Sequence, residues 1–137
     1  MISLRQPLPA SDMKNKIILV FGDLLALLIV TVIGFASHGE TSLSALPRIP
    51  TTFLPLTAAW FLTAPWLGLF RPQVTHNPRL LWRPLLAMLL AAPTAATLRG
   101  FMLNVPVLPL FALILGGSAA LIMTVWRAIF WLLRRGT

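Results

Sequence analysis

Few side chains in this sequence could take part in chemistry, and the most informative of them is Asp23. The chain of 137 residues has three acidic residues and two histidines. Asp23 lies six positions into an apolar run that begins at Ile17. A carboxylate within a membrane-spanning helix is costly and indicates a proton acceptor, a cation ligand or a buried ion-pair partner. We expect an ion pair with Arg83 or Arg127, which the topology below puts in the same leaflet, rather than a transport site.

The other polar candidates are three residues that flank apolar runs and one aromatic residue within a run. Glu40 and Arg99 follow the first and third runs, and we expect them to form an ion pair at the outer surface. His38 could ligate a metal or the magnesium of a chlorophyll-type pigment, because neutral imidazole is a common ligand. A hydrogen bond within its loop is the interpretation we favour. Trp60 could pack between helices, face lipid or stack on a bound ring, and we favour packing.

These residues do not form a catalytic or metal-binding pattern. Ser and Thr occur without an accompanying His and Asp, so no triad can be drawn. His38 and Glu40 alone are too few ligands for zinc. The absence of cysteine excludes disulfides, iron–sulfur clusters, thiolate zinc sites and covalent haem. His38 and His76 are expected on opposite sides of the membrane, which excludes a haem held by two histidines. We therefore predict no catalytic residues and no metal.

Four apolar stretches are the elements that must position these side chains. They lie near residues 17–36, 53–70, 80–98 and 107–126. Each is long enough to cross a hydrocarbon core of about 30 Å as a helix. With 58% hydrophobic and 10% charged residues, the chain lies outside the soluble class. The sequence predicts an all-α integral membrane four-helix bundle over residues 17–133, with a polar N-terminal arm at 1–16 and a tail at 134–137.

Positive charge alternates along the chain and predicts the orientation of this bundle. The segments around the four runs contain three, one, three, one and three Lys or Arg residues in chain order. Short loops rich in Lys and Arg stay in the cytoplasm. Nine positive charges on one side against two on the other therefore put both termini inside. The net charge of +8 then serves topology and contact with anionic headgroups, and we expect no nucleic-acid partner.

Small residues mark where helices can approach closely. The third run carries Ala87, Ala91 and Ala95 at four-residue spacing, and the fourth contains Gly116 and Gly117. Small side chains let membrane helices pack backbone to backbone. We expect these faces to meet each other or a partner subunit.

Four motifs follow one another at a recognisable spacing. They are GDLLAL at 22–27, SHGE at 37–40, GLFRP at 68–72 and LRG at 98–100. As a set they resemble an uncharacterised family of four-span prokaryotic integral membrane proteins, catalogued as a domain of unknown function. The resemblance covers the first three runs, and the fourth is matched by its hydrophobicity and the pair Trp126-Arg127. It implies a multi-pass protein of the prokaryotic inner membrane and brings no known activity, cofactor or catalytic residue.

Three functions fit this sequence. We favour an accessory or scaffold subunit of a larger membrane assembly, respiratory or photosynthetic, that contacts lipid, other integral membrane subunits and a surface pigment or quinone. The alternative is a small homodimeric transporter with Asp23 as the coupling carboxylate. The nine-to-two charge bias counts against it, since small exporters of this kind often insert in both orientations. A third possibility is a protein that acts on lipids and holds their headgroups with Arg71, Arg79 and Arg83.

Overall fold

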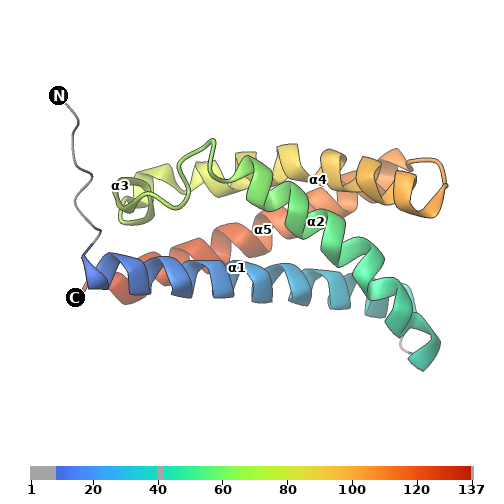
Figure 1. Cartoon of the computed structure of the whole chain (residues 1–137), viewed down its shortest axis with the longest axis horizontal. Coiled ribbons are helices and arrows are strands. Elements are labelled where there is room, and N and C mark those ends of the chain that lie inside the picture. The colour runs from blue at the N-terminus through green and yellow to red at the C-terminus, as the bar shows by residue number, and fades with distance from the viewer. Residues whose placement is uncertain (1–8, 40–41, 137) are drawn as a thin grey trace.

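The chain forms an all-α helical bundle. The computed structural model describes residues 9–39 and 42–136, and within these ranges four main helices are joined by shorter ones (Figure 1). The main helices are α1 (Ala10–Ser37), α2 (Ile49–Thr63), α4 (Trp82–Leu103) and α5 (Pro109–Arg134). The shorter elements are the 3-10 helix η1 (Leu43–Arg48) before α2, and α3 (Pro72–Thr75) and the 3-10 helix η2 (Pro78–Leu80) between α2 and α4.

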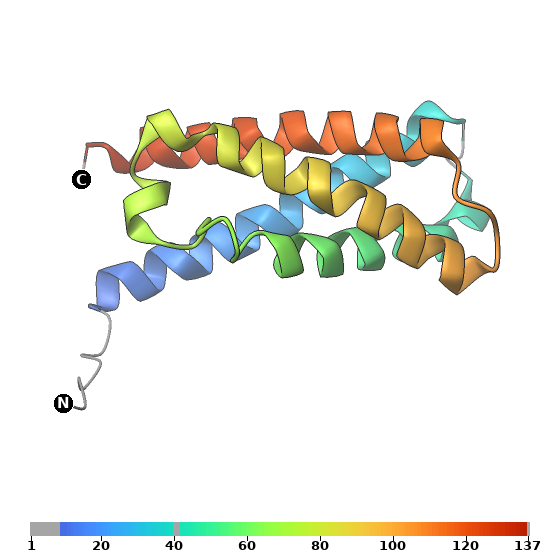
Figure 2. The same ribbon diagram turned by 90° about the horizontal axis from the view of Figure 1, so that it is seen from above.

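The four main helices run alternately up and down the length of the bundle (Figures 1 and 2). The start of α1, the end of α5 and the short helix α3 share one end, which we call the α3 end. The segment η1 and the turn from α4 to α5 lie at the other end, which we call the η1 end. The chain thus passes along the bundle four times, and both ends of the helical part lie together.

Three helical segments are long and apolar enough to cross a membrane, and they identify a multi-pass membrane protein. They are Ala10–Ser37, Pro78–Leu103 and Pro109–Arg134. The sequence predicted a fourth, spanning helix over 53–70, and this prediction is wrong in length. The helix α2 has 15 residues, which rise about 22 Å and fall short of a hydrocarbon core of about 30 Å.

The early end of α2 follows from Pro65 and Gly68. Pro65 has no N–H and cannot continue the helical ladder, so the ladder stops at the Ala64 N–H, which donates to the Trp60 carbonyl at 2.8 Å. Gly68 has a φ of +67°, a left-handed conformation that a glycine adopts without steric cost. The Leu69 N–H then donates to the Ala64 carbonyl at 3.1 Å. We call residues 64–71 the inner turn.

Other helix boundaries also differ from the sequence prediction. The helix α1 begins at Ala10, within the segment expected to be a polar arm up to residue 16. Asp12 lies in its first turn, where a negative charge is favourable beside the positive end of the helix dipole. Because α1 starts early, Asp23 lies near the middle of this helix rather than near its beginning. The helix α4 also runs further, to Leu103.

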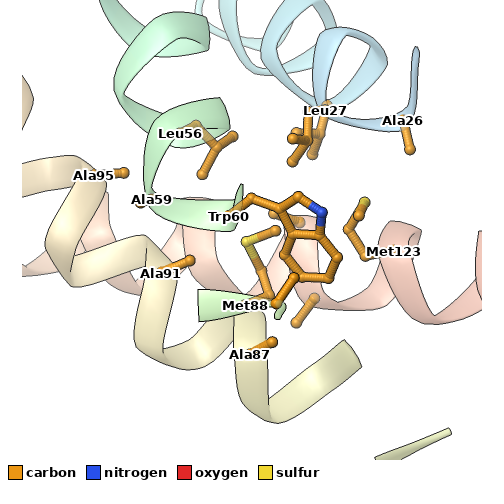
Figure 3. Close-up of a cluster of buried hydrophobic side chains, with 14 of the residues drawn as sticks. Ala26, Leu27, Leu56, Ala59, Trp60, Ala87, Met88, Ala91, Ala95 and Met123 are labelled. Atoms are coloured by element: carbon orange, nitrogen blue, oxygen red, sulfur yellow. The ribbon is translucent and has the colours of Figure 1, made fainter. Parts of the chain in front are cut away.

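Small residues of α4 lie along one side of the core that contains the large side chain of Trp60 (Figure 3). Ala87 and Ala91 are fully buried there, and Ala95 is almost so. On the neighbouring side, a Cβ added to Gly116 of α5 would come within 2.8 Å of the Ala92 side chain. The small-residue faces of α4 and α5 therefore meet each other inside this chain, which is one of the two arrangements the sequence predicted.

Candidate functional site

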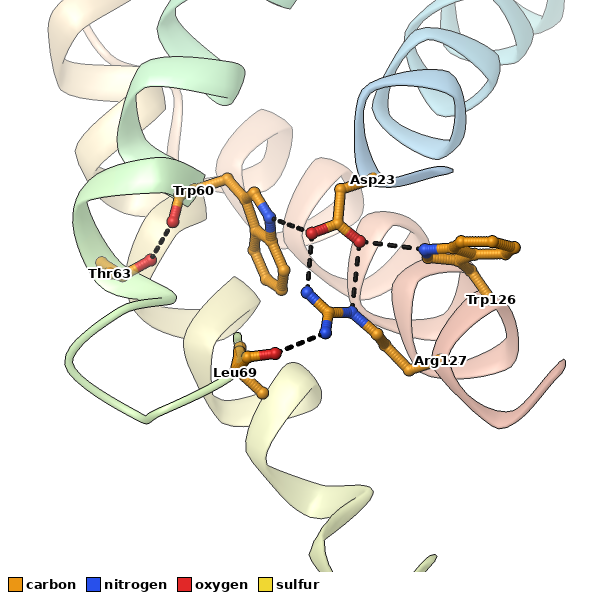
Figure 4. A network of polar contacts seen from close by, with 6 residues as sticks. All are labelled: Asp23, Trp60, Thr63, Leu69, Trp126 and Arg127. Atoms are coloured by element: carbon orange, nitrogen blue, oxygen red, sulfur yellow. Dashed lines mark hydrogen bonds and ion pairs between the residues drawn. The ribbon is translucent and has the colours of Figure 1, made fainter. Parts of the chain in front are cut away.

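The most unusual feature of the bundle interior is an ion pair between Asp23 of α1 and Arg127 of α5 (Figure 4). The two side chains are 0% and 4% exposed, respectively. The Arg127 Nη2 donates to Asp23 Oδ2 at 2.7 Å, and its Nε donates to Oδ1 at 3.1 Å. This is a two-point contact in which a planar guanidinium matches both oxygens of a carboxylate, and it fixes orientation as well as distance.

Two tryptophans complete the coordination of the carboxylate. The Trp60 indole N–H donates to Asp23 Oδ2 at 3.0 Å, and the Trp126 indole N–H donates to Oδ1 at 2.9 Å. Figure 4 shows the two rings approaching the carboxylate from opposite sides. An ionised carboxylate offers about four acceptor positions. With two donors from Arg127 and one from each indole, the Asp23 carboxylate has its acceptor capacity filled by protein groups.

The same guanidinium also holds the inner turn. The Arg127 Nη1 donates to the Leu69 carbonyl at 2.6 Å, and its central carbon lies 5.3 Å from the Phe70 ring centroid. On the other side of the turn, Arg83 Nη1 of α4 donates to the Leu67 carbonyl at 2.9 Å. Non-helical backbone at membrane depth is tolerated where protein groups satisfy it. The two arginines therefore supply donors that the inner turn lacks because α2 has ended.

We call the set of Asp23, Trp60, Trp126, Arg127 and the Leu69 carbonyl the Asp23 network. It joins α1, α2, the inner turn and α5 at one point. Gly22, the residue before Asp23, makes room for this arrangement, because a Cβ built on it would overlap the Trp126 indole. The absent side chain gives the ring the space from which its N–H reaches Asp23.

The structure separates the two arginines that the sequence proposed as partners of Asp23. Arg127 forms the ion pair. Arg83 does not contact Asp23: it donates to the Leu67 carbonyl, its guanidinium lies 5.6 Å from the Trp82 ring centroid, and its buried Nε has no hydrogen-bond partner among the described residues. Arg71 and Arg79 have exposed side chains and Arg83 a half-buried one, and a headgroup site formed by these three arginines stays a prediction.

Of the predicted ion pair between Glu40 and Arg99, the structure describes Arg99. Glu40 lies outside the described residues, so this pairing stays a prediction. The Arg99 Nε donates to the Thr52 hydroxyl oxygen at 3.2 Å, and its guanidinium carbon lies 4.9 Å from the Phe111 ring centroid. Arg99 thus connects α4 to α2 and α5 near the η1 end.

The two candidate cofactor residues, His38 and Trp60, lie in different surroundings, one exposed and one buried. His38 is exposed just after α1, and His76 follows α3 at the other end of the bundle. Among the described residues, no group of three or more His, Cys, Asp or Glu side chains could hold a metal ion. Trp60 is 0% exposed, and its ring packs in the core with its N–H on Asp23, which is the packing role.

Sequence reasoning missed the two indole donors and the carbonyls of the inner turn. A signal for Trp60 was present, because an indole N–H buried in an apolar run needs an acceptor and Asp23 is the one carboxylate within the predicted runs. Trp126 reaches inward from α5 to donate to Asp23. No sequence signal identified the carbonyls of Leu67 and Leu69, since every residue has one.

No curated protein and no solved structure matches this chain. A family model described as a protein of unknown function, DUF3054, matches residues 20–130. This range covers most of the chain and every member of the Asp23 network, and the chain therefore belongs to the DUF3054 family.

Proposed function

We propose that this protein is a small accessory subunit of a larger assembly in the prokaryotic cytoplasmic membrane, where it acts as a rigid helical unit. The observation that carries the proposal is the filled coordination of Asp23. Four protein donors occupy the carboxylate, and they come from α2 and α5, two parts of the chain that are distant from Asp23 in sequence. A buried charge of this kind fixes the relative position of helices.

The same geometry argues against the transporter alternative. A coupling carboxylate has to exchange a proton or bind a cation during the cycle. At Asp23 a cation would compete with the Arg127 guanidinium at 2.7 Å, and a proton would displace at least one of the four donors. Each step would break the contact between α1 and α5. The network therefore suits a structural role better than a transport cycle.

We further propose that the chain crosses the membrane four times with both termini in the cytoplasm. The helix α2 and the inner turn together would form the fourth crossing, with the Leu67 and Leu69 carbonyls satisfied by arginine. The nine positive charges in the segments proposed to lie inside, against two in those proposed to lie outside, support this orientation.

Purification in a mild detergent tests the proposed role. The tagged protein, expressed at its natural level, should elute with other integral membrane proteins in constant ratio, at a mass far above its own 15.1 kDa. The proposal fails if the chain elutes alone or as a homo-oligomer. Reconstituted liposomes provide the contrasting test: proton-driven uptake that disappears in Asp23→Asn while the variant stays folded would favour the transporter.

Cysteine labelling tests the topology independently, because the chain has no native cysteine. Gly136→Cys should be protected from a membrane-impermeant maleimide in intact cells and react after lysis. Ser42→Cys, in the segment between α1 and α2, should react in intact cells. Labelling of residue 136 from outside would overturn the proposed orientation.

A further inference from the structure

Between α4 and α5 near the η1 end there is a pocket that contains a charged side chain. The pocket has a volume of about 300 Å³ and is lined by Arg99, Gly100 and Phe111 together with the α4–α5 turn. Its wall is formed by close packing: a Cβ added to Gly100 would come within 3.1 Å of the Val105 carbonyl oxygen and of the Val107 side chain. The pair Arg99-Gly100 thus places a cation beside a glycine, and a side chain at position 100 would crowd the wall of the pocket.

The guanidinium is held in this pocket by protein contacts on one edge and one face. Its Nε is bound to Thr52, and its face lies over the Phe111 ring. The terminal Nη atoms have no hydrogen-bond partner among the described residues. Their N–H groups can donate hydrogen bonds to the oxygens of a phosphate. An arginine that extended freely to the interface would meet the headgroup of any lipid. Arg99 is instead anchored within a defined site.

An apolar groove adjoins the pocket and shares Val107 with it. The groove has a volume of about 430 Å³ and runs between α4 and α5, past Pro93 and Ala112. The hydroxyl of Thr97 in its wall donates to the Pro93 carbonyl at 2.8 Å, so this side chain does not present a free polar group to the groove. A cation at one end and an apolar channel beside it match an amphiphile with an anionic head.

We propose that this site binds one anionic phospholipid, with its phosphate on the Arg99 guanidinium and one acyl chain in the α4–α5 groove. Charge complementarity selects the lipid class, because a half-buried guanidinium with unfilled donors favours a head group with net negative charge over a zwitterionic one. The sequence-predicted partner Glu40 would compete with the phosphate for the same guanidinium. Replacing Glu40 therefore has a defined effect, which enters the test below.

Native mass spectrometry of the intact protein, released from micelles with added phosphatidylglycerol or phosphatidylethanolamine, tests the proposal. The wild type should retain one phosphatidylglycerol in preference to phosphatidylethanolamine. Arg99→Gln should lower this retention about tenfold, the effect of losing a hydrogen bond to a charged group. Arg135→Gln is the matched control, an exposed arginine at the other end of the bundle, and should leave retention unchanged.

Two variants that leave Arg99 intact complete the design. Ala112→Phe fills the groove and should lower retention of phosphatidylglycerol even if Arg99→Gln fails to fold. Glu40→Gln should leave retention unchanged or raise it. The proposal is overturned if the wild type retains both lipids equally, if folded Arg99→Gln keeps the preference, or if Ala112→Phe binds phosphatidylglycerol as the wild type does.

Discussion

Replacing Asp23 with asparagine should destabilise the bundle strongly, although the two side chains have nearly the same shape. In the wild type, two N–H donors reach each oxygen of the carboxylate. The asparagine amide keeps one acceptor oxygen and puts an NH₂ group in place of the other. Two donors then lose their acceptor, and the Arg127 guanidinium, 4% exposed, loses its counter-charge.

The uncompensated charge dominates the cost. Removing one partner of a buried ion pair costs about 3–5 kcal/mol, whereas hydrogen bonds between membrane helices average about 0.6 kcal/mol. We therefore expect Asp23→Asn to lose about 3–5 kcal/mol of unfolding free energy. The measurement is reversible unfolding in detergent micelles titrated with SDS, followed by far-UV circular dichroism.

A double variant distinguishes the charge from the hydrogen bonds. Asp23→Leu combined with Arg127→Met removes both charges and leaves the Leu69 carbonyl and two indole N–H groups without partners. At about 0.6 kcal/mol for each group, the double variant should lose about 2 kcal/mol, less than either single variant. A dominant cost from the unpaired charge is contradicted if Asp23→Asn loses less than about 1 kcal/mol, or if the two single losses simply add in the double variant.

Three substitutions and one control variant test the packing around the network, in the same SDS titration. Gly22→Ala forces the Trp126 ring to move and should cost about 1–3 kcal/mol. Gly34→Ala on the same helix meets open space and should stay within about 0.5 kcal/mol of the wild type; equal losses would contradict the role of Gly22. Gly68→Ala should cost about 1–2 kcal/mol because of its left-handed φ, and should also speed hydrogen exchange in the inner turn. Trp60→Phe removes one donor to the carboxylate and should cost about 1 kcal/mol; an unchanged stability would show that this hydrogen bond contributes nothing.

The sequence predicts the helical membrane class well because hydropathy acts over whole segments. Long apolar runs identify α1, α4 and α5 without any knowledge of their contacts. The small number of charges also narrows the partner of Asp23 to Arg83 or Arg127. The choice between the two arginines depends on the backbone, because Arg83 donates to the Leu67 carbonyl of the inner turn. The inner turn depends in turn on contacts with other helices, which the local sequence does not show.

The length of α2 escaped prediction for a related reason. Apolar residues continue past Thr63 with Leu67, Leu69 and Phe70. The mean hydropathy of the segment therefore stays high and does not reveal that the backbone leaves the helical conformation. Pro65 and Gly68 gave a local signal, but proline is tolerated within membrane helices when neighbours satisfy the freed groups. Whether such neighbours exist depends on Arg83 and Arg127, which lie in other helices.

The position of Arg127 on the last helix has a consequence for biogenesis. The ribosome delivers α1, α2 and the inner turn to the membrane before α5 emerges. During that interval Asp23 lacks its counter-ion and the Leu69 carbonyl lacks its guanidinium donor. The N-terminal half therefore has to wait in a loosely packed state near the insertion machinery, and a nascent chain halted before residue 127 would remain a substrate for membrane quality-control proteases.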